Sequence, residues 1–190
     1  MTLNVPAVVG YIWMALAAVW FIGLAFTKRT VRSQAMGSRM FHMILVILGY
    51  TLLCSDRLRA GWLGLRFLPP SHAAEIVGVA LTAAGCLFAT WARLTLGSNW
   101  SGRATVKANH ELIVSGPYAV ARHPIYTGLL VASVGTAMAF GEARCLLGLV
   151  LIFLGFAVKI GQEERFMQET FPQAYPAYRQ RVRALIPGVF

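Results

Sequence analysis

The chain has 190 residues, of which 57% are hydrophobic and only 13% charged, and its mean hydropathy is +0.63. A soluble domain carries about a quarter charged residues, so this composition excludes an ordinary soluble enzyme and indicates an integral membrane protein. The length leaves no room for a separate soluble catalytic domain, so any active site must be built from membrane helices and their connectors.

The basic residues lie in short connectors between apolar runs, not along one soluble face. The formal net charge is +10, but this distribution favours phosphate-rich membrane headgroups over nucleic acid as the partner. The three cysteines, Cys54, Cys86 and Cys145, lie within or at the end of apolar runs and lack metal-ligand spacing. We interpret them as packing residues and expect no redox or metal centre.

Three apolar runs in the first half predict membrane-spanning helices. They are Val5–Phe26, which has no charged residue, the shorter Met40–Ser55, and Ile76–Leu96. The first run is long enough to cross a bilayer core as a helix. Four basic residues follow it closely: Lys28, Arg29, Arg32 and Arg39. By the positive-inside rule, this connector lies in the cytoplasm and the N-terminus lies outside.

Two features beside these runs suit the membrane surface. The connector Asp56–Ala74 contains Trp62 and Phe67, which are typical of an interfacial loop on the outer side. Arg93 lies near the cytoplasmic end of the third run. We expect its long side chain to extend to the headgroups, and the alternative is a place at the edge of a site.

The second half begins with a long polar connector, Leu96–Arg122, which two further apolar runs follow, Pro124–Phe140 and Cys145–Val158. The short segment 141–144 between these runs predicts a tight helical hairpin. Small residues let membrane helices approach one another closely. Four glycines at heptad-like intervals are expected to do so here: Gly128, Gly135, Gly148 and Gly155.

The chain becomes more polar toward its end. From Gly161 we expect a mixed polar and apolar helix, which Pro172 ends or bends. Apolar residues at spacings of three or four then predict an interfacial amphipathic helix. They are Tyr175, Tyr178, Val182 and Leu185. The sequence thus predicts an all-α integral membrane fold with five transmembrane helices, a cytoplasmic cofactor pocket and a C-terminal amphipathic helix. Residues 1–96 would form the first three spans, and residues 97–190 the catalytic half.

Polar and aromatic residues concentrate in the stretch His110–Gly128, HELIVSGPYAVARHPIYTG, and an acidic pair, Glu163 and Glu164, follows the fifth apolar run. Pro124 is well placed to begin a helix, whose unpaired N–H groups and positive dipole end favour an anion. Arg122 adds a planar guanidinium that can bind a carboxylate through two hydrogen bonds. We therefore expect the chemistry of this protein in that stretch.

Together with Tyr175, Tyr178, Arg181 and the closing Leu185-Ile186-Pro187, these motifs resemble the isoprenylcysteine carboxyl methyltransferase family and its phospholipid methyltransferase relatives. The resemblance covers the chain from about Gly97 onward. It implies S-adenosylmethionine as methyl donor, and as acceptor the carboxylate of a prenylated cysteine or, in relatives, another group. Matching the family's motif residue by residue implies cofactor contacts by His110, Glu111, Leu112, Ile113, Tyr118, His123, Pro124, Ile125, Tyr126, Glu163 and Glu164.

The resemblance also implies residues on the acceptor side. The family's substrate-side arginines match Arg122 and Arg181, which would orient the acceptor for catalysis. Lys159 stands where some members have a substrate-contacting arginine, so it is a further candidate for substrate binding.

The residue types alone support the same arrangement. A donor with a sulfonium, an ammonium and a carboxylate needs acids, cations and aromatic faces, which Glu163, His123, Tyr118 and Tyr126 supply. A carboxylate acceptor is ionised at neutral pH and needs no general base, so alignment and desolvation can provide most of the catalysis. The space between helices would admit a lipid tail from the bilayer, while the donor enters from the cytoplasm.

Other functions remain open at this point. Within the same family, the acceptor could be an amine phospholipid or a thiol. A small channel or transporter is the alternative from another class, because charged groups at span ends can line an ion path. No glycine-rich strand-to-helix fingerprint predicts a Rossmann domain, and His110 and His123 lack a convincing third zinc ligand.

Overall fold

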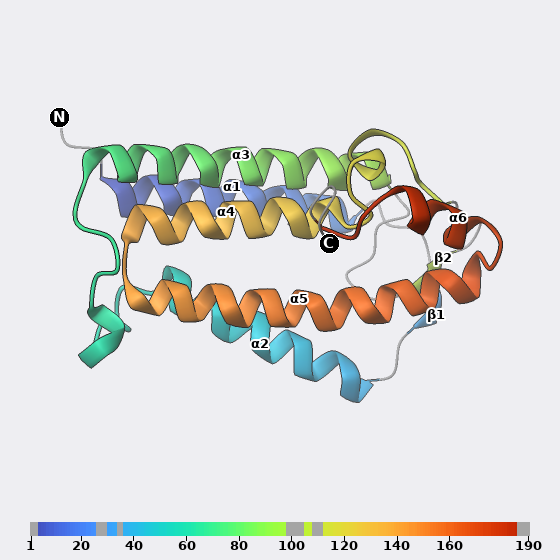
Figure 1. Cartoon of the computed structure of the whole chain (residues 1–190), viewed down its shortest axis with the longest axis horizontal. Coiled ribbons are helices and arrows are strands. Elements are labelled where there is room, and N and C mark those ends of the chain that lie inside the picture. The colour runs from blue at the N-terminus through green and yellow to red at the C-terminus, as the bar shows by residue number, and fades with distance from the viewer. Residues whose placement is uncertain (1–3, 26–29, 34–35, 98–104, 108–111, 186–190) are drawn as a thin grey trace.

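The computed structural model describes residues 4–25, 30–33, 36–97, 105–107 and 112–185 (Figure 1). Within these residues, six α-helices form the molecule: α1 (Val5–Leu24), α2 (Met36–Cys54), α3 (His72–Leu96), α4 (Pro124–Phe140), α5 (Ala143–Thr170) and α6 (Ala174–Arg181). Two 3-10 turns, η1 (Gly61–Gly64) and η3 (Gly116–Ala119), lie in the connectors. The predicted helical fold is therefore found, with one addition in the connectors.

That addition is a two-stranded antiparallel ribbon of β1 (Thr30–Ser33) and β2 (Thr105–Lys107). It joins the connector that follows α1 to the connector that follows α3. Each strand is very short, and neither shows the alternating pattern that would have announced it in the sequence. The pairing places the two connectors at the same end of the helix bundle (Figure 1).

The helices form two layers. As Figure 1 shows, α1, α3 and α4 lie together on one side, and α2 and α5 lie on the other. The closest packing joins α3 to α4 and α2 to α5, whereas α4 and α5 contact each other much less. A shared core of buried apolar residues connects the layers where α4 turns into α5. Both halves of the chain thus contribute to each layer.

Glycines explain why these two helix pairs pack so closely. A Cβ added to Gly128 of α4 would lie 2.7 Å from the backbone N of Ala89 in α3, and one added to Gly135 would lie 2.4 Å from the backbone N of Thr82. In the other layer, a Cβ on Gly148 of α5 would lie 2.7 Å from the carbonyl O of Gly49 in α2. Gly155 is similarly close to α2. The predicted close approach at all four glycines is confirmed.

The expected tight hairpin of the fourth and fifth apolar runs is only half correct. The turn is tight, because Gly141 adopts a φ of +65° and α5 begins at Ala143. Beyond the turn, the two helices contact each other much less than each contacts a helix from the first half of the chain. The helix predicted from Gly161 is the continuation of α5, which extends to Thr170 before Pro172.

Arg144 lies at the start of α5, and its side chain is completely buried. Its Nη1 donates to the carbonyl O atoms of Leu52 and Leu53, at 2.8 and 2.9 Å, and its Nε lies 2.6 Å from Glu142. Arg59 also pairs with Glu142, at 3.0 Å. These contacts cap the C-terminal end of α2, where carbonyl groups lack helical partners. They attach α2 to the α4–α5 turn.

The prediction that Arg93 extends to the headgroups is wrong. The residue is buried, and its guanidinium donates from Nη1 to the carbonyl O of Gly97 at 3.0 Å and from Nη2 to that of Gly23 at 2.9 Å. The side chain therefore joins the C-terminal ends of α1 and α3, whose carbonyl groups carry the negative end of the helix dipole. Length and charge alone could not reveal these two carbonyl partners.

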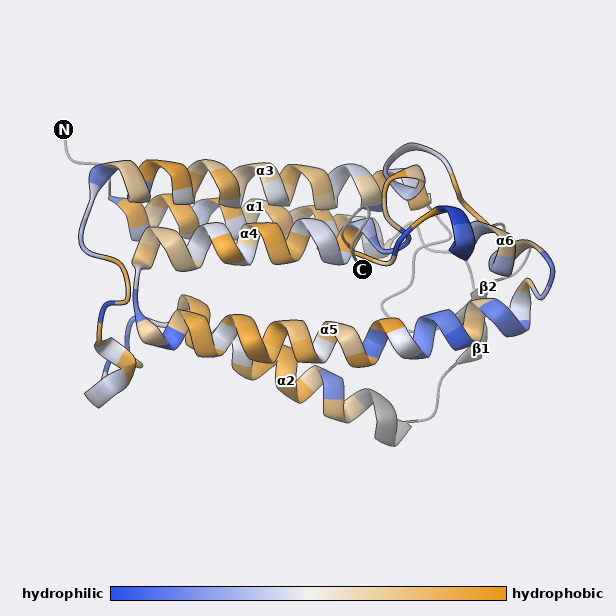
Figure 2. Ribbon diagram, in the orientation of Figure 1, coloured by the Kyte–Doolittle hydropathy of each residue, from blue (hydrophilic) through white to orange (hydrophobic). Residues whose placement is uncertain are grey.

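Three of the helices are long and apolar enough to cross a membrane: residues Val5–Gly23 of α1, His72–Leu96 of α3 and Ala143–Thr170 of α5. The apolar helices Met40–Cys54 and Pro124–Phe140 are shorter. Figure 2 shows apolar residues along the helix bodies and hydrophilic residues gathered on α6 and the neighbouring end of α5. The polar end of the bundle is therefore distinct from its apolar body.

Candidate functional site

The polar loop before α4 is shaped by its glycine and its prolines. Gly116 has a φ of +59°, a region that glycine adopts without strain, and it begins the turn η3, with Pro117 as the second residue. Pro124 is the first residue of α4, where its missing N–H costs no helical hydrogen bond. His123 directly precedes it and is buried. The sequence thus fixes where this histidine stands relative to the helix.

The C-terminal segment lies along this loop. The backbone N of Arg122 donates to the carbonyl O of Arg183 at 2.8 Å, and that of His123 donates to Ala184 at 2.9 Å. The hydroxyl of Thr127 donates to the carbonyl O of Leu185 at 2.8 Å. From α6, the hydroxyl of Tyr178 reaches the carbonyl O of Tyr118 at 2.5 Å. The end of the chain therefore holds the loop and the start of α4 in place.

Arg122 is almost saturated by contacts within the protein. Its Nε and Nη2 donate to Oε1 of Glu164, at 2.9 and 2.5 Å. Its Nη1 donates to the carbonyl O of Val182 and, at 3.3 Å, to that of Arg179. Only 7% of the side chain is exposed. In this arrangement Arg122 ties the acid on α5 to the C-terminal segment.

His123, Tyr126 and Glu163 form a second group beside it. The hydroxyl of Tyr126 donates to Glu163 Oε1 at 2.8 Å, and Nδ1 of His123 lies 3.5 Å from Glu163 Oε2. The rings of His123 and Tyr126 stack with centroids 5.8 Å apart, and Tyr126 stacks in turn on Phe156. An aromatic surface thus runs from the acidic pair into the apolar body of the bundle.

Ion pairs join these residues into one ionic cluster, which consists of Arg122, His123, Lys159, Glu163, Glu164 and Arg179. Its charges do not balance. Two carboxylates, those of Glu163 and Glu164, contact three basic side chains. Lys159 lies 3.9 Å from Glu163, and Arg179 lies 3.4 Å from Glu164, which also pairs with Arg122. The cluster is therefore net positive even when the imidazole of His123 is neutral. Such a cluster attracts an anion.

The imidazole of His123 is held between both acids. Its Nε2 lies 3.4 Å from Glu164 Oε1, outside hydrogen-bond geometry, and no other group in the described part of the chain bonds to that nitrogen. Burial alone would lower the pKa of His123, but the carboxylates of Glu163 and Glu164 outweigh it, so the pKa lies above its ordinary value. His123 thus favours the protonated form.

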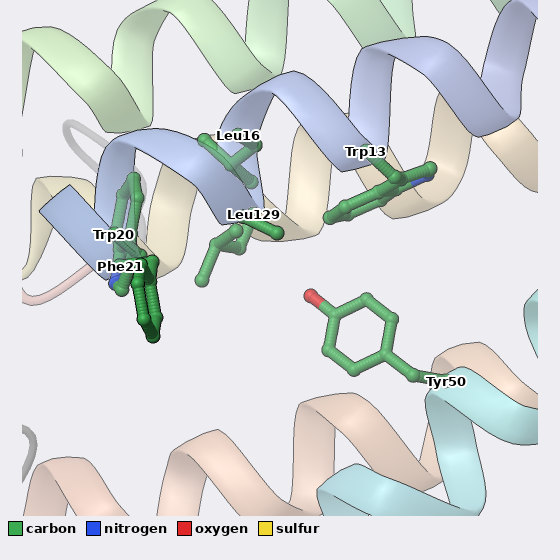
Figure 3. Close-up of a pocket in the computed structure, with 7 residues that line it drawn as sticks. Trp13, Leu16, Trp20, Phe21, Tyr50 and Leu129 are labelled. Atoms are coloured by element: carbon green, nitrogen blue, oxygen red, sulfur yellow. The ribbon is translucent and has the colours of Figure 1, made fainter.

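An apolar cleft opens near the ionic cluster. It has a volume of about 590 Å³ and lies between the two helix layers (Figure 3). Its lining residues come from α1, α2 and α4: Trp13, Leu16, Ala17, Trp20, Phe21, Tyr50 and Leu129. Leu129 is three residues beyond Tyr126 on α4, so these two residues lie about one helical turn apart along the helix.

The structure brings together most of the residues that the sequence singled out. Tyr118, His123, Tyr126, Lys159, Glu163 and Glu164 surround the start of α4, with Arg122 and Pro124. Leu112, Ile113 and Ile125 are half-buried. His110 and Glu111 lie outside the described residues. Arg181 is exposed on α6, where its Nε donates to the carbonyl O of Ala177 at 3.4 Å.

Three residues of the cluster were not expected from the sequence. Arg179 contacts Glu164, Thr127 binds the C-terminal segment, and Phe156 extends the aromatic stack. Thr127 directly follows Tyr126 in the stretch that the sequence singled out, so its place in the cluster could have been predicted. Nothing in the sequence locates Arg179 or Phe156.

Comparison with known proteins gives one consistent family. Residues 77–169 match the model of the isoprenylcysteine carboxyl methyltransferase (ICMT) family. Protein-S-isoprenylcysteine O-methyltransferase B of Arabidopsis thaliana is 30% identical over 115 residues, which are 59% of this chain and 58% of that protein. The Schizosaccharomyces pombe protein-S-isoprenylcysteine O-methyltransferase is 32% identical over 99 residues, 50% of this chain and 42% of that protein.

Two further matches extend the comparison. The cobalt-zinc-cadmium resistance protein CzcN of Cupriavidus metallidurans is 31% identical over 127 residues, which are 66% of this chain and 53% of that protein. The solved structure of the eukaryotic intramembrane Ras methyltransferase ICMT superposes with a TM-score of 0.58 at 24% identity, covering 78% of this chain and 52% of that one.

These matches define the fold and the family. The chain spans about half the length of the relatives it matches. Its fold is that of an intramembrane protein, and its apolar helices make it a multi-pass integral membrane protein. Through residues 77–169, the chain belongs to the isoprenylcysteine carboxyl methyltransferase family.

Proposed function

We propose that this protein is a membrane methyltransferase that transfers a methyl group from S-adenosylmethionine to the carboxylate of a lipophilic, isoprenylcysteine-like acceptor. One observation carries the proposal. The ionic cluster of His123, Tyr126, Glu163 and Glu164 lies about one helical turn from an apolar cleft, so a charged donor and a lipid chain can meet there.

The proposed topology has five crossings, formed by α1 to α5, with the N-terminus outside and the ionic cluster on the cytoplasmic side. The ribbon of β1 and β2 supports it, because it joins the connectors after α1 and α3 at one end of the bundle. Those connectors carry many of the basic residues, as cytoplasmic loops do. In this arrangement α6 lies on the membrane surface beside the cluster.

The residues of the cluster fit the chemical groups of the donor. Glu163 and Glu164 can face its ammonium and sulfonium, and the rings of Tyr118 and Tyr126 offer faces to a cation. Nε2 of His123 is buried without hydrogen-bond geometry to a neighbour in the described residues, so it has a bond to offer. When bound, S-adenosylmethionine supplies an electrophilic methyl group. The side chains bind and orient the reactants and keep water away.

The net positive charge of the cluster favours a carboxylate acceptor over an amine. A carboxylate is attracted to the surplus cation and is already ionised at neutral pH, so no general base has to remove a proton. An ammonium headgroup, in contrast, would have to lose a proton before methylation. Alignment and desolvation between the cluster and the cleft then provide the catalysis.

The two arginines assigned to the acceptor have different surroundings. Arg122 holds Glu164 and the C-terminal segment, so its contribution to the acceptor is to keep the acid pair in place. Arg181 is exposed and can meet a carboxylate at the membrane surface. Lys159 lies over the ring of Tyr126, with its Nζ 5.6 Å from the ring centroid. We assign the acceptor carboxylate to Lys159 and Arg181.

The test is a titration of the purified protein with radiolabelled S-adenosylmethionine against a panel of acceptors. We expect transfer to a prenylcysteine carboxylate and not to its amide, which has the same lipid tail. Transfer only to an amine phospholipid or to a thiol would refute the carboxylate acceptor. Absence of donor binding would refute a methyltransferase of any kind and favour a channel or transporter.

A further inference from the structure

Exposed arginines gather at the end of the bundle that holds the ionic cluster. Arg165 directly follows Glu164 on α5, and three more lie on α6 and just after it: Arg179, Arg181 and Arg183. All four arginines are exposed. Figure 2 shows this gathering of hydrophilic residues on α6 and the neighbouring end of α5. These four residues form the arginine patch.

The arginine patch is continuous with the ionic cluster. Arg179 belongs to both, since its Nε lies 3.4 Å from Oε2 of Glu164. The carbonyl O of Arg183 accepts a hydrogen bond from the backbone N of Arg122 at 2.8 Å, which holds this part of the chain against the loop before α4. A molecule bound at the ionic cluster therefore lies next to the patch.

Nearby acids do not neutralise the patch. Within the described part of the chain, no carboxylate pairs with Arg165, Arg181 or Arg183. The loop 112–123 and the segment 159–185 together contain six lysine and arginine residues but only three glutamates. This end of the bundle therefore keeps a surplus of positive charge at neutral pH.

Two arginines at the opposite end of the bundle have acidic partners. Arg59 pairs with Asp56 at 3.1 Å and with Glu142 at 3.0 Å, and Arg144 is buried against Glu142. Unpaired like charges repel one another, so a surplus on one surface is unfavourable until an opposite charge arrives. Such a surplus beside the ionic cluster attracts a negatively charged partner.

We infer that the natural acceptor carries further negative charge beside the carboxylate that is methylated, and that the arginine patch binds this charge. A prenylated polypeptide with acidic residues next to its lipid-modified end has this chemistry. The inference rests on the proposed function and narrows its acceptor from any lipophilic carboxylate to an acidic one. The lipid tail still enters the apolar cleft, so the patch selects only the polar part of the acceptor.

The experiment compares prenylcysteine peptides that share one lipid tail and a free carboxylate, and whose residues before the cysteine are acidic, neutral or basic. Values of kcat/KM are measured with the full chain in vesicles of zwitterionic phosphatidylcholine at low salt. We expect the acidic peptide to exceed the neutral one by about tenfold, because several exposed ion pairs each contribute a little, and the basic peptide to fall below it. Salt screens exposed charges, so this preference should shrink as salt is added.

A double variant tests the patch itself. Arg165→Gln combined with Arg183→Gln removes two of its charges and leaves the residues assigned to the reacting carboxylate in place. The acidic preference should fall to about threefold, while turnover of the neutral peptide stays at the wild-type level. The matched control combines Arg57→Gln with Arg66→Gln, two exposed arginines at the opposite end of the bundle, and should keep the full preference.

Equal turnover of the three peptides would overturn the inference and leave the proposed function intact. A preference that survives in the double variant, or that disappears in the control, would also overturn it. If the double variant lost turnover of all peptides alike, the arginines would serve lipid headgroups, and the inference would be wrong.

The failure of the proposed function has a different result, because no peptide would then be methylated. Binding is therefore measured in parallel as the fluorescence anisotropy of the labelled acidic peptide. Binding that weakens with salt and in the double variant, without methylation, would reject the proposed function and keep the arginine patch as a surface for an acidic partner. Absence of this binding would reject both.

Discussion

Arg122 contributes through the groups it holds. A guanidinium can bind one carboxylate and two carbonyl groups at once, whereas the ammonium of a lysine is a point charge without this planar geometry. Glu164 is mostly buried, so the loss of its partner would leave a poorly solvated charge. The position of Glu164 in the ionic cluster thus depends on Arg122, a residue that the sequence assigned to the acceptor.

Arg122→Lys should therefore lower the thermal unfolding midpoint as well as turnover. We expect a loss of about 2 kcal/mol in unfolding free energy, as for charge-assisted hydrogen bonds that are removed from a buried pair. A double-mutant cycle with Glu164→Gln should show strong coupling between the two positions. If Arg122→Lys kept the wild-type unfolding midpoint and donor affinity while turnover fell, Arg122 would act on the acceptor directly.

Glu163 contacts Tyr126, His123 and Lys159, and the proposed function places it beside the cationic groups of the donor. Glu163→Gln should weaken calorimetric binding of S-adenosylmethionine by about tenfold or more, since a charged hydrogen bond becomes a neutral one. Glu169→Gln, an exposed change further along α5, is the matched control and should bind normally. Equal donor affinity in both variants would remove Glu163 from the donor site.

The raised pKa of His123 has a consequence for stability. Because the folded pKa exceeds the unfolded value of about 6.5, protonation stabilises the folded state. This contribution is complete below that unfolded value and disappears as the pH rises through the folded pKa. The groups that face the imidazole are Glu163, Glu164 and Tyr126.

We expect the thermal unfolding midpoint of the wild type to fall as the pH rises from about 6 through the folded pKa, and His123→Gln to remove this dependence. Differential scanning calorimetry across the neutral range measures both. A midpoint that rises with pH over this window, or a pH dependence that the variant retains, would contradict the assignment of a protonated His123.

At the scale of helices, close packing depends on the small residues at the contact. The backbones of α3 and α4 meet at Gly85 and Gly128, where an added Cβ on either residue would lie 2.4 to 2.7 Å from the partner's backbone. No flexible side chain can move aside to make room. The contact therefore fixes α4, and with it the start of the helix beside the ionic cluster.

Gly128→Ala should lower the unfolding free energy by about 1–3 kcal/mol, because the helices must separate to admit the methyl group. Gly10→Ala is the matched control, since an added Cβ on Gly10 meets nothing within 4 Å. That variant should be neutral or slightly stabilised, because alanine favours a helix. Similar destabilisation of both variants would show that helix propensity, and not the contact, decides stability.

Helix positions could be predicted because they follow from local sequence. Apolar runs, prolines and charged connectors placed α1 to α4 within a few residues, and the glycine intervals predicted the closely packed faces. The choice of partner helix is not local. Helix α4 packs on α3 and helix α5 packs on α2, which lie earlier in the chain. The hydroxyls of Thr82 in α3 and Thr136 in α4, for example, share a hydrogen bond across 54 residues.

The candidate site shows the same division between local and distant information. The motif around His123 and the acidic pair were visible as unusual polar groups near apolar runs, and the structure brings them together. The roles of Arg144 and Arg93 were missed because their partners are backbone carbonyl groups of distant helices. Every residue has a backbone carbonyl group, so the sequence does not show which of them an arginine will contact.

For the whole molecule, the arrangement of two layers explains how an ionic cluster and an apolar cleft can be neighbours. The α1–α3–α4 layer and the α2–α5 layer are joined at the α4–α5 turn by the buried cluster around Arg144. The cleft lies between them, and the C-terminal segment closes over the loop before α4. Water-soluble and lipid reactants can thus approach one site from different surroundings.

The proposed function is tested most directly by identifying the bond that holds the transferred methyl group to the acceptor. Purified protein is incubated with methyl-labelled S-adenosylmethionine and a lipophilic carboxylate, and the product is treated with mild alkali. The account predicts that the label is released as methanol, as from a methyl ester, and that Glu163→Gln reduces its formation. Label that stays on the product as an alkali-stable N-methyl or S-methyl group would contradict it.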